Sequence, residues 1–128
     1  MADVRFEREA KTVVAVLTGE VDMSNATAVR QQIAEFVTPD EEAVIVDLSE
    51  LSFMDSAGLH AMIELGTVLD ERRQQLLLCV SHGSTIERAI VIIGLPQAIS
   101  VHSDRGEAIE VARTSAMESR QVGPTEDA

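Results

Sequence analysis

Apolar and polar residues alternate near the start of the chain in a way that predicts two paired β-strands. Val4 and Phe6 alternate with charged residues, a pattern typical of a half-exposed edge strand. A β-branched run over residues 12–18 follows a short turn near Ala10, and β-branched residues favour strands. We therefore expect an antiparallel hairpin, after which residues 19–22 leave the sheet as a loop.

Helical and strand patterns alternate along the rest of the chain. Near-continuous apolar runs over residues 43–48 and 76–80 are typical of strands covered on both faces, and residues 99–102 predict one more short strand. Apolar residues recur at helical spacing in four segments, and each segment follows a residue that can cap the start of a helix. These candidate caps are Ser24 or Asn25, Asp55, Ser84 and Ser103. This order predicts an α/β domain with a mixed sheet, in which an N-terminal antiparallel hairpin precedes parallel strands packed with about four helices.

Length and composition place this pattern in one globular domain. With 128 residues and 45% hydrophobic content, the chain is long enough to bury a core of its own. The only aromatic side chains are three Phe, so we expect an aliphatic core. After Met117 the sequence becomes polar and ends in acidic residues. We assign residues 1–116 to the domain and predict that residues 117–128 form a flexible acidic tail.

The charge of the chain limits the classes of partner that we expect. The formal net charge is −12, from 22 acidic and 10 basic side chains. Such a surface repels nucleic-acid phosphates and anionic lipid headgroups. The scarcity of aromatic rings also argues against a surface that stacks bases. We therefore expect protein partners, and neither nucleic acid nor a membrane.

Signals for export and for membrane insertion are not found in this sequence. No apolar stretch follows a basic start, and the longest unbroken apolar runs are about five residues, against ~20 for a membrane span. The lone cysteine, Cys79, lies within an apolar run and is expected to be a buried, inert thiol. We expect a cytoplasmic protein.

The segment 51–59 is the strongest candidate for chemistry, because it joins a predicted strand to a predicted helix. Asp55 and Ser56 fall at the helix start, where a serine hydroxyl faces solvent and free backbone amides attract anions. A phosphoryl group on Ser56 would add roughly −1.5 to −2 charges beside Asp55 and near Asp22 without unfolding the helix. Gly58 would let a partner approach the backbone closely. The same residues also fit a simple helix cap, and this interpretation stays open.

Three motifs resemble those of the STAS-domain anti-sigma factor antagonists. Residues 51–59 are similar to the family's phosphorylation-site motif, in which Asp-Ser-small-Gly-Leu follows an apolar strand. Residues 19–22, Gly-Glu-Val-Asp, resemble the motif that closes the family's second strand, and residues 94–108 resemble its closing segment. The resemblance covers roughly residues 4–113. His60 is a departure, because family members often carry Gly after the Gly-Leu pair.

The resemblance implies a switch protein rather than an enzyme, with no catalytic residue, no cofactor and no metal. The unphosphorylated form would bind an anti-sigma factor that is also a serine kinase, and so free a sigma factor for RNA polymerase. The kinase would then use ATP to phosphorylate Ser56 and end the association, and a serine phosphatase would reverse this. We expect the partner-binding surface to include Glu20, Asp22, Ser24, Phe53, Asp55, Ser56, Gly58, Leu59, His60 and Met62.

Other functions stay open on sequence alone. STAS domains also serve as scaffold subunits and as accessory subunits of lipid transporters. A serine hydrolase is a third candidate, because residues 54–58 miss the Gly-x-Ser-x-Gly elbow only at the first position; its base would be His82 or His102, oriented by Asp70 or Asp104. His60 and Glu64 lie one helical turn apart and could share a metal, but a solvated helix face is the favoured interpretation. The oligomeric state is not predicted.

Overall fold

Strands and helices alternate along the chain after an N-terminal pair of strands. The computed structural model describes the backbone of residues 1–126 and the side chains of residues 1–115. In chain order, its elements are β1 (Ala2–Glu9), β2 (Thr12–Val21), α1 (Ala26–Phe36), β3 (Ala43–Asp47), β4 (Leu51–Met54), α2 (Ser56–Glu71), β5 (Gln75–Cys79), α3 (Thr85–Ile92), the 3₁₀ helix η1 (Leu95–Gln97), β6 (Ser100–His102) and α4 (Arg105–Glu126).

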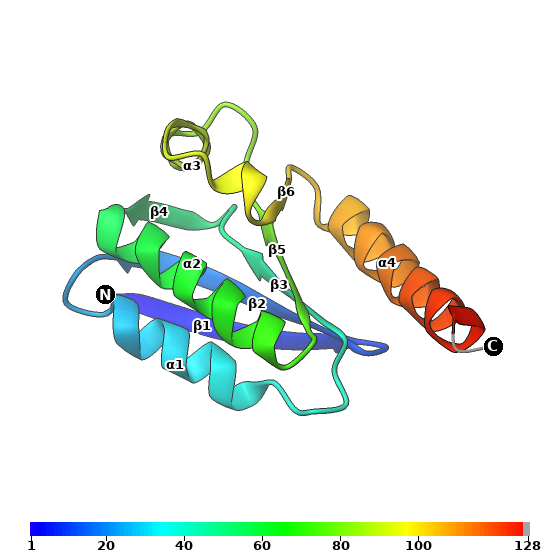
Figure 1. Cartoon of the computed structure of the whole chain (residues 1–128). Coiled ribbons are helices and arrows are strands. Elements are labelled where there is room, and N and C mark those ends of the chain that lie inside the picture. Colours follow the sequence, from blue (N-terminus) through cyan, green and yellow to red (C-terminus); the bar gives the residue numbers. More distant parts are fainter. Residues whose placement is uncertain (127–128) are drawn as a thin grey trace.

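The strands form one mixed sheet in the order β1-β2-β3-β5-β6, and β4 pairs with the end of β2 (Figure 1). β1 runs antiparallel to β2 in an unbroken register from Ala2–Gly19 to Glu9–Thr12. The remaining strand pairs are parallel. The predicted mixed sheet, with a leading hairpin and parallel strands, is therefore confirmed.

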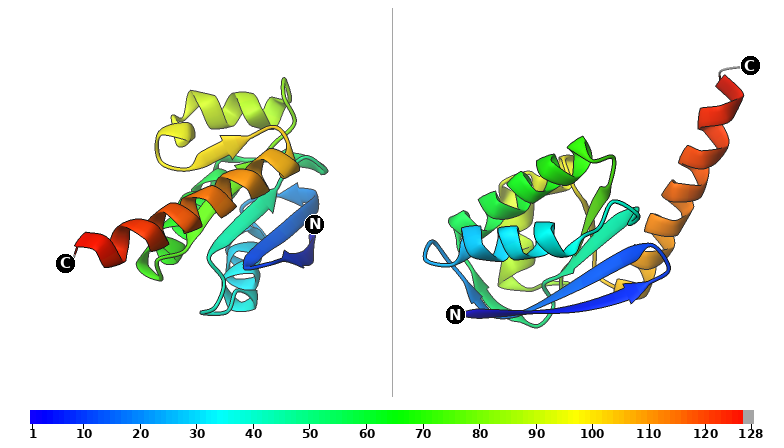
Figure 2. Two further views of the ribbon diagram at one scale, coloured as in Figure 1. Left: turned by 90° about the vertical axis from the view of Figure 1, so that its right-hand side faces the viewer. Right: turned by 90° about the horizontal axis from the view of Figure 1, so that it is seen from below.

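Successive residues of the central strands face opposite layers, as the two-residue period of a strand requires. On one face, the row Val13–Val44–Leu76 lies in the larger apolar cluster, together with the buried sides of α1, α2 and α3. On the other face, the row Val14–Ile45–Leu77 packs with α4. The two views of Figure 2 show α4 on the side of the sheet opposite to α1 and α2. The core is aliphatic, as the composition predicts.

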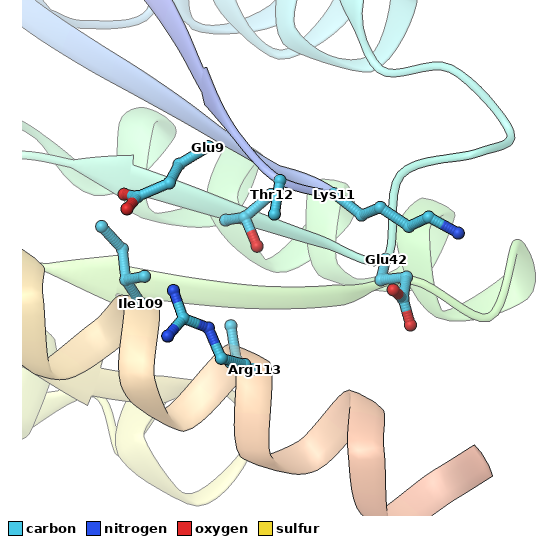
Figure 3. A pocket seen from close by; sticks show the side chains of 8 residues that line it. Glu9, Lys11, Thr12, Glu42, Ile109 and Arg113 are labelled. Carbon is cyan, nitrogen blue, oxygen red and sulfur yellow. The ribbon is translucent and has the colours of Figure 1, made fainter.

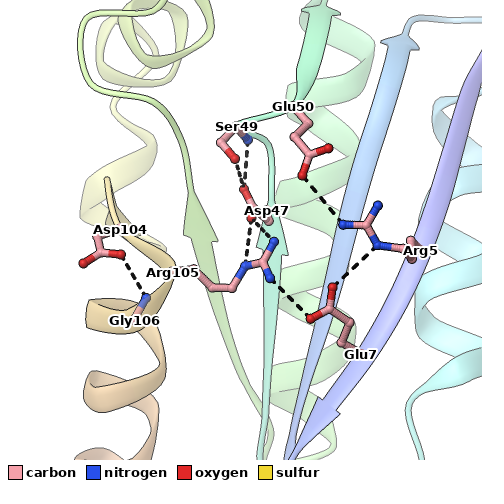
Figure 4. Close-up of polar contacts among 8 residues, drawn as sticks. All are labelled: Arg5, Glu7, Asp47, Ser49, Glu50, Asp104, Arg105 and Gly106. Carbon is pink, nitrogen blue, oxygen red and sulfur yellow. Dashed lines mark hydrogen bonds and ion pairs between the residues drawn. The ribbon is translucent and has the colours of Figure 1, made fainter.

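A charged network fastens α4 to the sheet (Figure 4). Arg105 donates from Nε and Nη2 to Asp47 Oδ2, at 3.1 and 2.8 Å, and from Nη1 to Glu7 Oε1 at 3.3 Å. The other oxygen of Asp47 accepts hydrogen bonds from the nitrogen and the hydroxyl of Ser49. Burial acts to raise the pKa of Asp47, but the bonds from Ser49 and Arg105 outweigh it and hold that pKa below its ordinary value.

Several local expectations are corrected by the structure. Residues 19–22 do not leave the sheet as a loop, because β2 continues to Val21 across a bulge at Gly19 and pairs there with β4. The last helix begins at Arg105, where Asp104 Oδ1 accepts a hydrogen bond from the Gly106 nitrogen, so Asp104 takes the capping role expected of Ser103.

The segment 117–128 was expected to be a tail, and its backbone is helical as far as Glu126 because α4 continues to that residue. Its predicted flexibility stays a prediction. Across the described part of the chain, none of the helices has the length and apolar character that crossing a bilayer requires.

Candidate functional site

The start of α2 is fixed by Asp55, which lies just before the helix in extended conformation. Its Oδ1 accepts a hydrogen bond from the Gly58 nitrogen at 3.1 Å, which satisfies one of the free amides of the first turn. Its own nitrogen donates to the Val21 carbonyl oxygen at 3.2 Å, so the beginning of α2 is tied to the end of β2. Asp55 is therefore a helix cap, which agrees with the simpler of the two interpretations of this segment.

Ser56 is the first residue of α2, and its side chain is exposed. Its hydroxyl makes no hydrogen bond with any residue in the described part of the chain. The main-chain nitrogens of Ser56 and Ala57 are likewise without a described acceptor, as expected for the first turn of a helix. The hydroxyl is therefore open to modification from solvent, and free amides lie next to it.

The loop that follows β2 lies beside this helix start and is held by its own polar groups. Asp22 Oδ1 accepts hydrogen bonds from the nitrogen and the hydroxyl of Ser24, and these bonds lower the pKa of Asp22. Asn25 Oδ1 accepts from the Asp22 nitrogen, and Asn25 Nδ2 donates to the Glu20 carbonyl oxygen, both at 2.9 Å. The carboxylate of Asp22 is therefore ionised and belongs to an ordered loop.

β4 brings one aromatic side chain to the same end of the sheet. Phe53 is opposite Glu20 in the β2–β4 register, and 47% of the Phe53 surface is exposed. The bulge that makes this pairing possible is at Gly19, where φ is +89° and an added Cβ would lie 2.2 Å from the Met1 carbonyl oxygen. Only glycine fits both conditions.

Gly58 has a different role from the one expected. A Cβ at this position would lie 2.5 Å from Met54 Cγ and 3.0 Å from Val21 Cγ1. Glycine is therefore required for the first turn of α2 to pack against β2 and β4 inside the protein. The expectation that it allows a partner to approach the backbone is corrected, because Gly58 is buried.

The predicted partner-binding residues divide by burial. Glu20, Ser24, Phe53, Ser56 and His60 are exposed, and Asp22 and Asp55 are half-buried. In contrast, Leu59 is 5% exposed and Met62 is fully buried. Their inclusion is corrected together with that of Gly58, because side chains inside the core cannot contact a docked protein.

Met23 is an exposed residue that the sequence reasoning missed. It lies between Asp22 and Ser24 in the loop after β2, and 85% of its surface is exposed. An apolar residue within an otherwise polar loop was the available signal.

The possible metal pair at His60 and Glu64 lies on an exposed helix face. His60 Nε2 is 3.9 Å from Glu64 Oε2, and 71% of the histidine side chain is exposed. Within the described residues, no group of three or more His, Cys, Asp or Glu side chains is arranged to hold a metal.

The side chains that a hydrolase would need do not converge on Ser56. Both ring nitrogens of His102 are engaged elsewhere, with Ser100 Oγ at 2.6 Å and with Glu107 Oε1 at 2.9 Å. His82 Nδ1 lies 3.5 Å from Glu87 Oε2. Asp104 caps α4, and Asp70 is fourteen residues further along α2 than Ser56, or ~21 Å at the rise of an α-helix. The serine-hydrolase alternative is therefore not supported by the arrangement of these groups.

A cavity of about 250 Å³ lies at the opposite end of the sheet from Ser56, between the β1–β2 turn and α4 (Figure 3). It combines acidic and basic side chains over an apolar floor, and its lining residues are Glu9, Ala10, Lys11, Thr12, Glu42, Ile109, Ala112 and Arg113. Ser56 does not line this cavity. The cavity therefore cannot be the substrate pocket of a reaction at Ser56.

Residues 3–108 match the STAS domain family. The chain belongs to this family, and the resemblance inferred from its motifs is confirmed.

Relatives of this chain include named regulators. RsfB, an anti-sigma-F factor antagonist of Mycobacterium tuberculosis, is 29% identical over 102 residues, which cover 78% of this chain and 82% of RsfB. The anti-sigma-B factor antagonist of Listeria monocytogenes is 27% identical over 101 residues, covering 79% and 88% of the two chains.

Solved structures share the fold. The crystal structure of an anti-sigma factor antagonist from Mycobacterium paratuberculosis has a TM-score of 0.79 at 24% identity, over 88% of this chain and 95% of that one. SpoIIAA of Bacillus in its phosphorylated form has a TM-score of 0.62 at 24% identity, over 84% and 97% of the two chains.

Part of a transporter is also similar. Sulfate transporter 3.1 of Arabidopsis thaliana is 27% identical over 94 residues, which cover 62% of this chain but only 14% of the transporter.

Proposed function

We propose that this protein is an anti-sigma factor antagonist whose association with its anti-sigma factor is ended by phosphorylation of Ser56. The observation that supports this most is the position of Ser56, exposed at the first residue of α2 next to the cap Asp55. A hydroxyl in this position is open to a kinase without any unfolding. The regulators named among the relatives support the same class of function.

The helix start is chemically suited to carry a phosphoryl group. The free amides of Ser56 and Ala57 and the helix dipole attract negative charge, and an anion at such an end is stabilised by ~0.3–1 kcal/mol. Asp55 already occupies the Gly58 amide, so an added phosphoryl group does not have to displace the cap. The modification would therefore leave the fold intact and act on the partner.

The surroundings of Ser56 explain how the modification would weaken binding. The exposed Glu20 and the ionised Asp22 lie at the end of β2, which is hydrogen-bonded to Asp55. A phosphoryl group adds roughly −1.5 to −2 charges to this acidic surface. Like charges in an interface cost several kcal/mol, and a loss of ~3 kcal/mol weakens binding about a hundredfold.

The contact surface that we propose consists of the exposed and half-buried residues of this end of the sheet. Met23 and Phe53 are its exposed apolar residues, and aromatic side chains are frequent energetic anchors of interfaces. The residues of the proposed contact surface are Glu20, Asp22, Met23, Ser24, Phe53, Asp55, Ser56 and His60. Its acidic rim fits a partner with a basic face.

The remaining steps of the cycle follow from this role. The partner would be a serine-kinase anti-sigma factor that uses ATP, and a serine phosphatase would return Ser56 to its free form. The cycle places the protein in the cytoplasm, where sigma factors act.

The similarity to a segment of sulfate transporter 3.1 favours one second candidate. In that role the domain would be an accessory subunit of a transport complex. Phosphorylation of Ser56 would then not be part of its basic function.

Incubation of the purified protein with the candidate kinase anti-sigma factor and ATP, followed by mass spectrometry, tests the proposal. We expect one phosphoryl group on Ser56, none in a Ser56→Ala variant, and unchanged labelling in Ser103→Ala, a matched variant of an exposed serine outside the surface. A phosphoryl group on another residue contradicts the proposed site. Stable association with a transporter and none with an anti-sigma factor contradicts the proposed class.

A further inference from the structure

β1 is a long edge strand, and its outer side has no partner strand among the described residues. It is the first strand in the sheet order and pairs with β2 alone. In the right-hand view of Figure 2, β1 (darkest blue) lies along the margin of the sheet. β6, at the other end of the order, has three residues, whereas β1 has eight. An open edge of this length presents a row of main-chain donors and acceptors to another strand.

The register of the hairpin shows which main-chain groups of β1 point outward. The Glu20 nitrogen donates to the Met1 carbonyl oxygen at 2.9 Å, so these two residues form a hydrogen-bonded pair one step before the first pair of the register. Hydrogen-bonded pairs come at every second residue of an antiparallel ladder, so the odd-numbered residues of β1 bond to β2. The N–H and C=O groups of Ala2, Val4 and Phe6 therefore point out of the sheet.

The side chains of these three residues form an apolar row on one face of the strand. Ala2, Val4 and Phe6 are half-buried and lie against the apolar cluster on the α1 side of the sheet. A strand added at this edge would cover the part of the row that is still exposed.

Two opposite charges lie on the other face of the same strand. Asp3 and Arg5 are exposed there, and 58% of the Arg5 side chain is accessible. Arg5 Nε is 3.5 Å from Glu7 Oε2, and Arg5 Nη2 is 3.7 Å from Glu50 Oε2 (Figure 4). Both distances exceed the usual length of a hydrogen bond, so the guanidinium keeps donors for a further carboxylate.

We propose that β1 pairs antiparallel with β1 of a second copy of this chain, about a two-fold axis at Val4. In this register Val4 is opposite Val4 of the second copy, and Ala2 is opposite Phe6. The outward groups of these residues exchange two hydrogen bonds in each pair. Asp3 is opposite Arg5 of the second copy, and the symmetry repeats this ion pair. Both ion pairs fall at non-hydrogen-bonded positions, where side chains of neighbouring strands are closest.

The charges select this register over its neighbours. An axis at Asp3 or at Arg5 would place that residue opposite its own copy, and an axis at Phe6 would place Asp3 opposite Glu9. Like charges directly opposite one another destabilise a strand pair. β1 is therefore complementary to itself when the axis is at Val4, which favours a second copy over an unrelated strand. This dimer goes beyond the proposed switch, because none of these residues belongs to the surface around Ser56.

Sedimentation velocity of the purified protein from micromolar to millimolar concentrations tests the proposal. The measurement uses physiological ionic strength, because salt screens the repulsion between two copies that each carry a formal charge of −12. We expect a reversible equilibrium between monomer and dimer. A protein that stays monomeric over the whole range overturns the proposal.

Val4→Pro tests the hydrogen bonds of the proposed ladder. Proline removes the central outward N–H, and an edge strand tolerates proline where this group faces solvent. We expect a folded monomer by circular dichroism and sedimentation, whereas the control Val4→Ala keeps the N–H and should still dimerise. A folded Val4→Pro variant that dimerises like the unmodified protein overturns the proposal. If Val4→Pro does not fold, the charge variants decide.

Asp3→Arg and Arg5→Asp test the register. Each variant alone places like charges opposite one another at both symmetric positions and should weaken self-association about tenfold or more. An equimolar mixture of the two variants has opposite charges at both positions. Native mass spectrometry should therefore detect a heterodimer of the two variants in preference to either homodimer.

Asp40→Arg is the matched control for the charge variants. It makes the same change of charge as Asp3→Arg at an exposed acid outside β1, and it should leave the dimer unchanged. Equal losses of self-association in Asp3→Arg and Asp40→Arg would show that the attraction is diffuse and would overturn the proposal. A mixture of Asp3→Arg and Arg5→Asp that forms no heterodimer also overturns it.

Discussion

The main-chain nitrogen of Asp55 donates a hydrogen bond to the carbonyl oxygen of Val21, at 3.2 Å. This bond joins the residue before α2 to the last residue of β2. It places the loop that begins with Asp22 beside Ser56, although the two segments are more than thirty residues apart in sequence. The acidic loop and the candidate phosphorylation site therefore form one surface.

The first prediction concerns the rim of this surface. Asp22→Ala removes a half-buried loop carboxylate and its hydrogen bonds with Ser24, so we expect weaker binding of the anti-sigma factor. Its free energy of unfolding should change by no more than about 0.5 kcal/mol, as for most surface substitutions. Titration calorimetry and urea unfolding measure the two effects. Asp40→Ala, an exposed acid outside the surface, is the control, and equal losses of affinity in both variants would contradict the assignment.

The second prediction separates an exposed anchor from a core residue. Phe53→Ala should weaken binding with little change in stability, because 47% of its surface is exposed. Leu59→Ala should instead lower the free energy of unfolding by ~2–5 kcal/mol, because it removes a buried leucine from the core. Thermal unfolding of the two variants checks the difference. A strongly destabilised Phe53→Ala variant and a stable Leu59→Ala variant would contradict the placement of Phe53 on the surface and of Leu59 in the core.

The third prediction compares the two glycines of α2. Gly58→Ala should destabilise the protein by ~1–3 kcal/mol, because the new methyl group collides with Met54 and Val21. Gly66→Ala should be neutral or stabilising by up to ~1 kcal/mol, because the methyl group fits and alanine favours the helix. Urea unfolding of both variants measures this contrast, and similar effects at the two positions would show that the packing of α2 is misjudged.

The fourth prediction is a pH dependence of stability that arises at Asp47. The pKa of Asp47 is held below its ordinary value of 3.8 in the folded protein, so folding favours the ionised form. The resulting stability is fully present well above pH 3.8 and is lost as the pH falls through the lower, folded-state pKa. Unfolding measured between pH 6 and pH 3 should show a smaller acid-induced loss in Asp47→Asn than in the unmodified protein.

Arg105→Met provides a second measure of the same network. It leaves the nearly buried Asp47 without its cation and should cost ~1–3 kcal/mol at neutral pH. Two results together would contradict the role given to Asp47 and Arg105. The Asp47→Asn variant would lose as much stability in acid as the unmodified protein, and Arg105→Met would be as stable as the unmodified protein at neutral pH.

Much of the fold could be predicted because the relevant signals are local. The alternation at Val4 and Phe6 indicates the edge strand, and Ser84 Oγ does accept a hydrogen bond from the Glu87 nitrogen at the start of α3. The start of α2 at Ser56 also follows from local chemistry, because Asp55 is a strong capping residue.

The parts that were missed depend on contacts between distant segments. The pairing of β4 with the end of β2 is set by a bulge at Gly19, and a bulge has no clear pattern in a single sequence. The requirement for glycine at position 58 comes from Met54 and Val21, which only the folded chain brings together.

The errors in the candidate surface have a different origin. Leu59 and Met62 belong to the apolar stripe that predicts α2, and a stripe of this kind faces the core. Both are close to Ser56 in sequence, but their positions on the helix turn them toward the core. Burial follows the helical period, so the contact surface contains the neighbours of Ser56 on the outer face and on the adjoining loop.

The most direct test of the central claim is a comparison of two Ser56 variants by titration calorimetry with the anti-sigma factor. Ser56→Ala should bind as tightly as the unmodified protein, whereas Ser56→Glu places a negative charge at the helix start and should bind at least about tenfold more weakly. Both variants should show the same melting temperature within a few degrees, since the side chain is exposed. Equal affinity of the two folded variants would contradict the account.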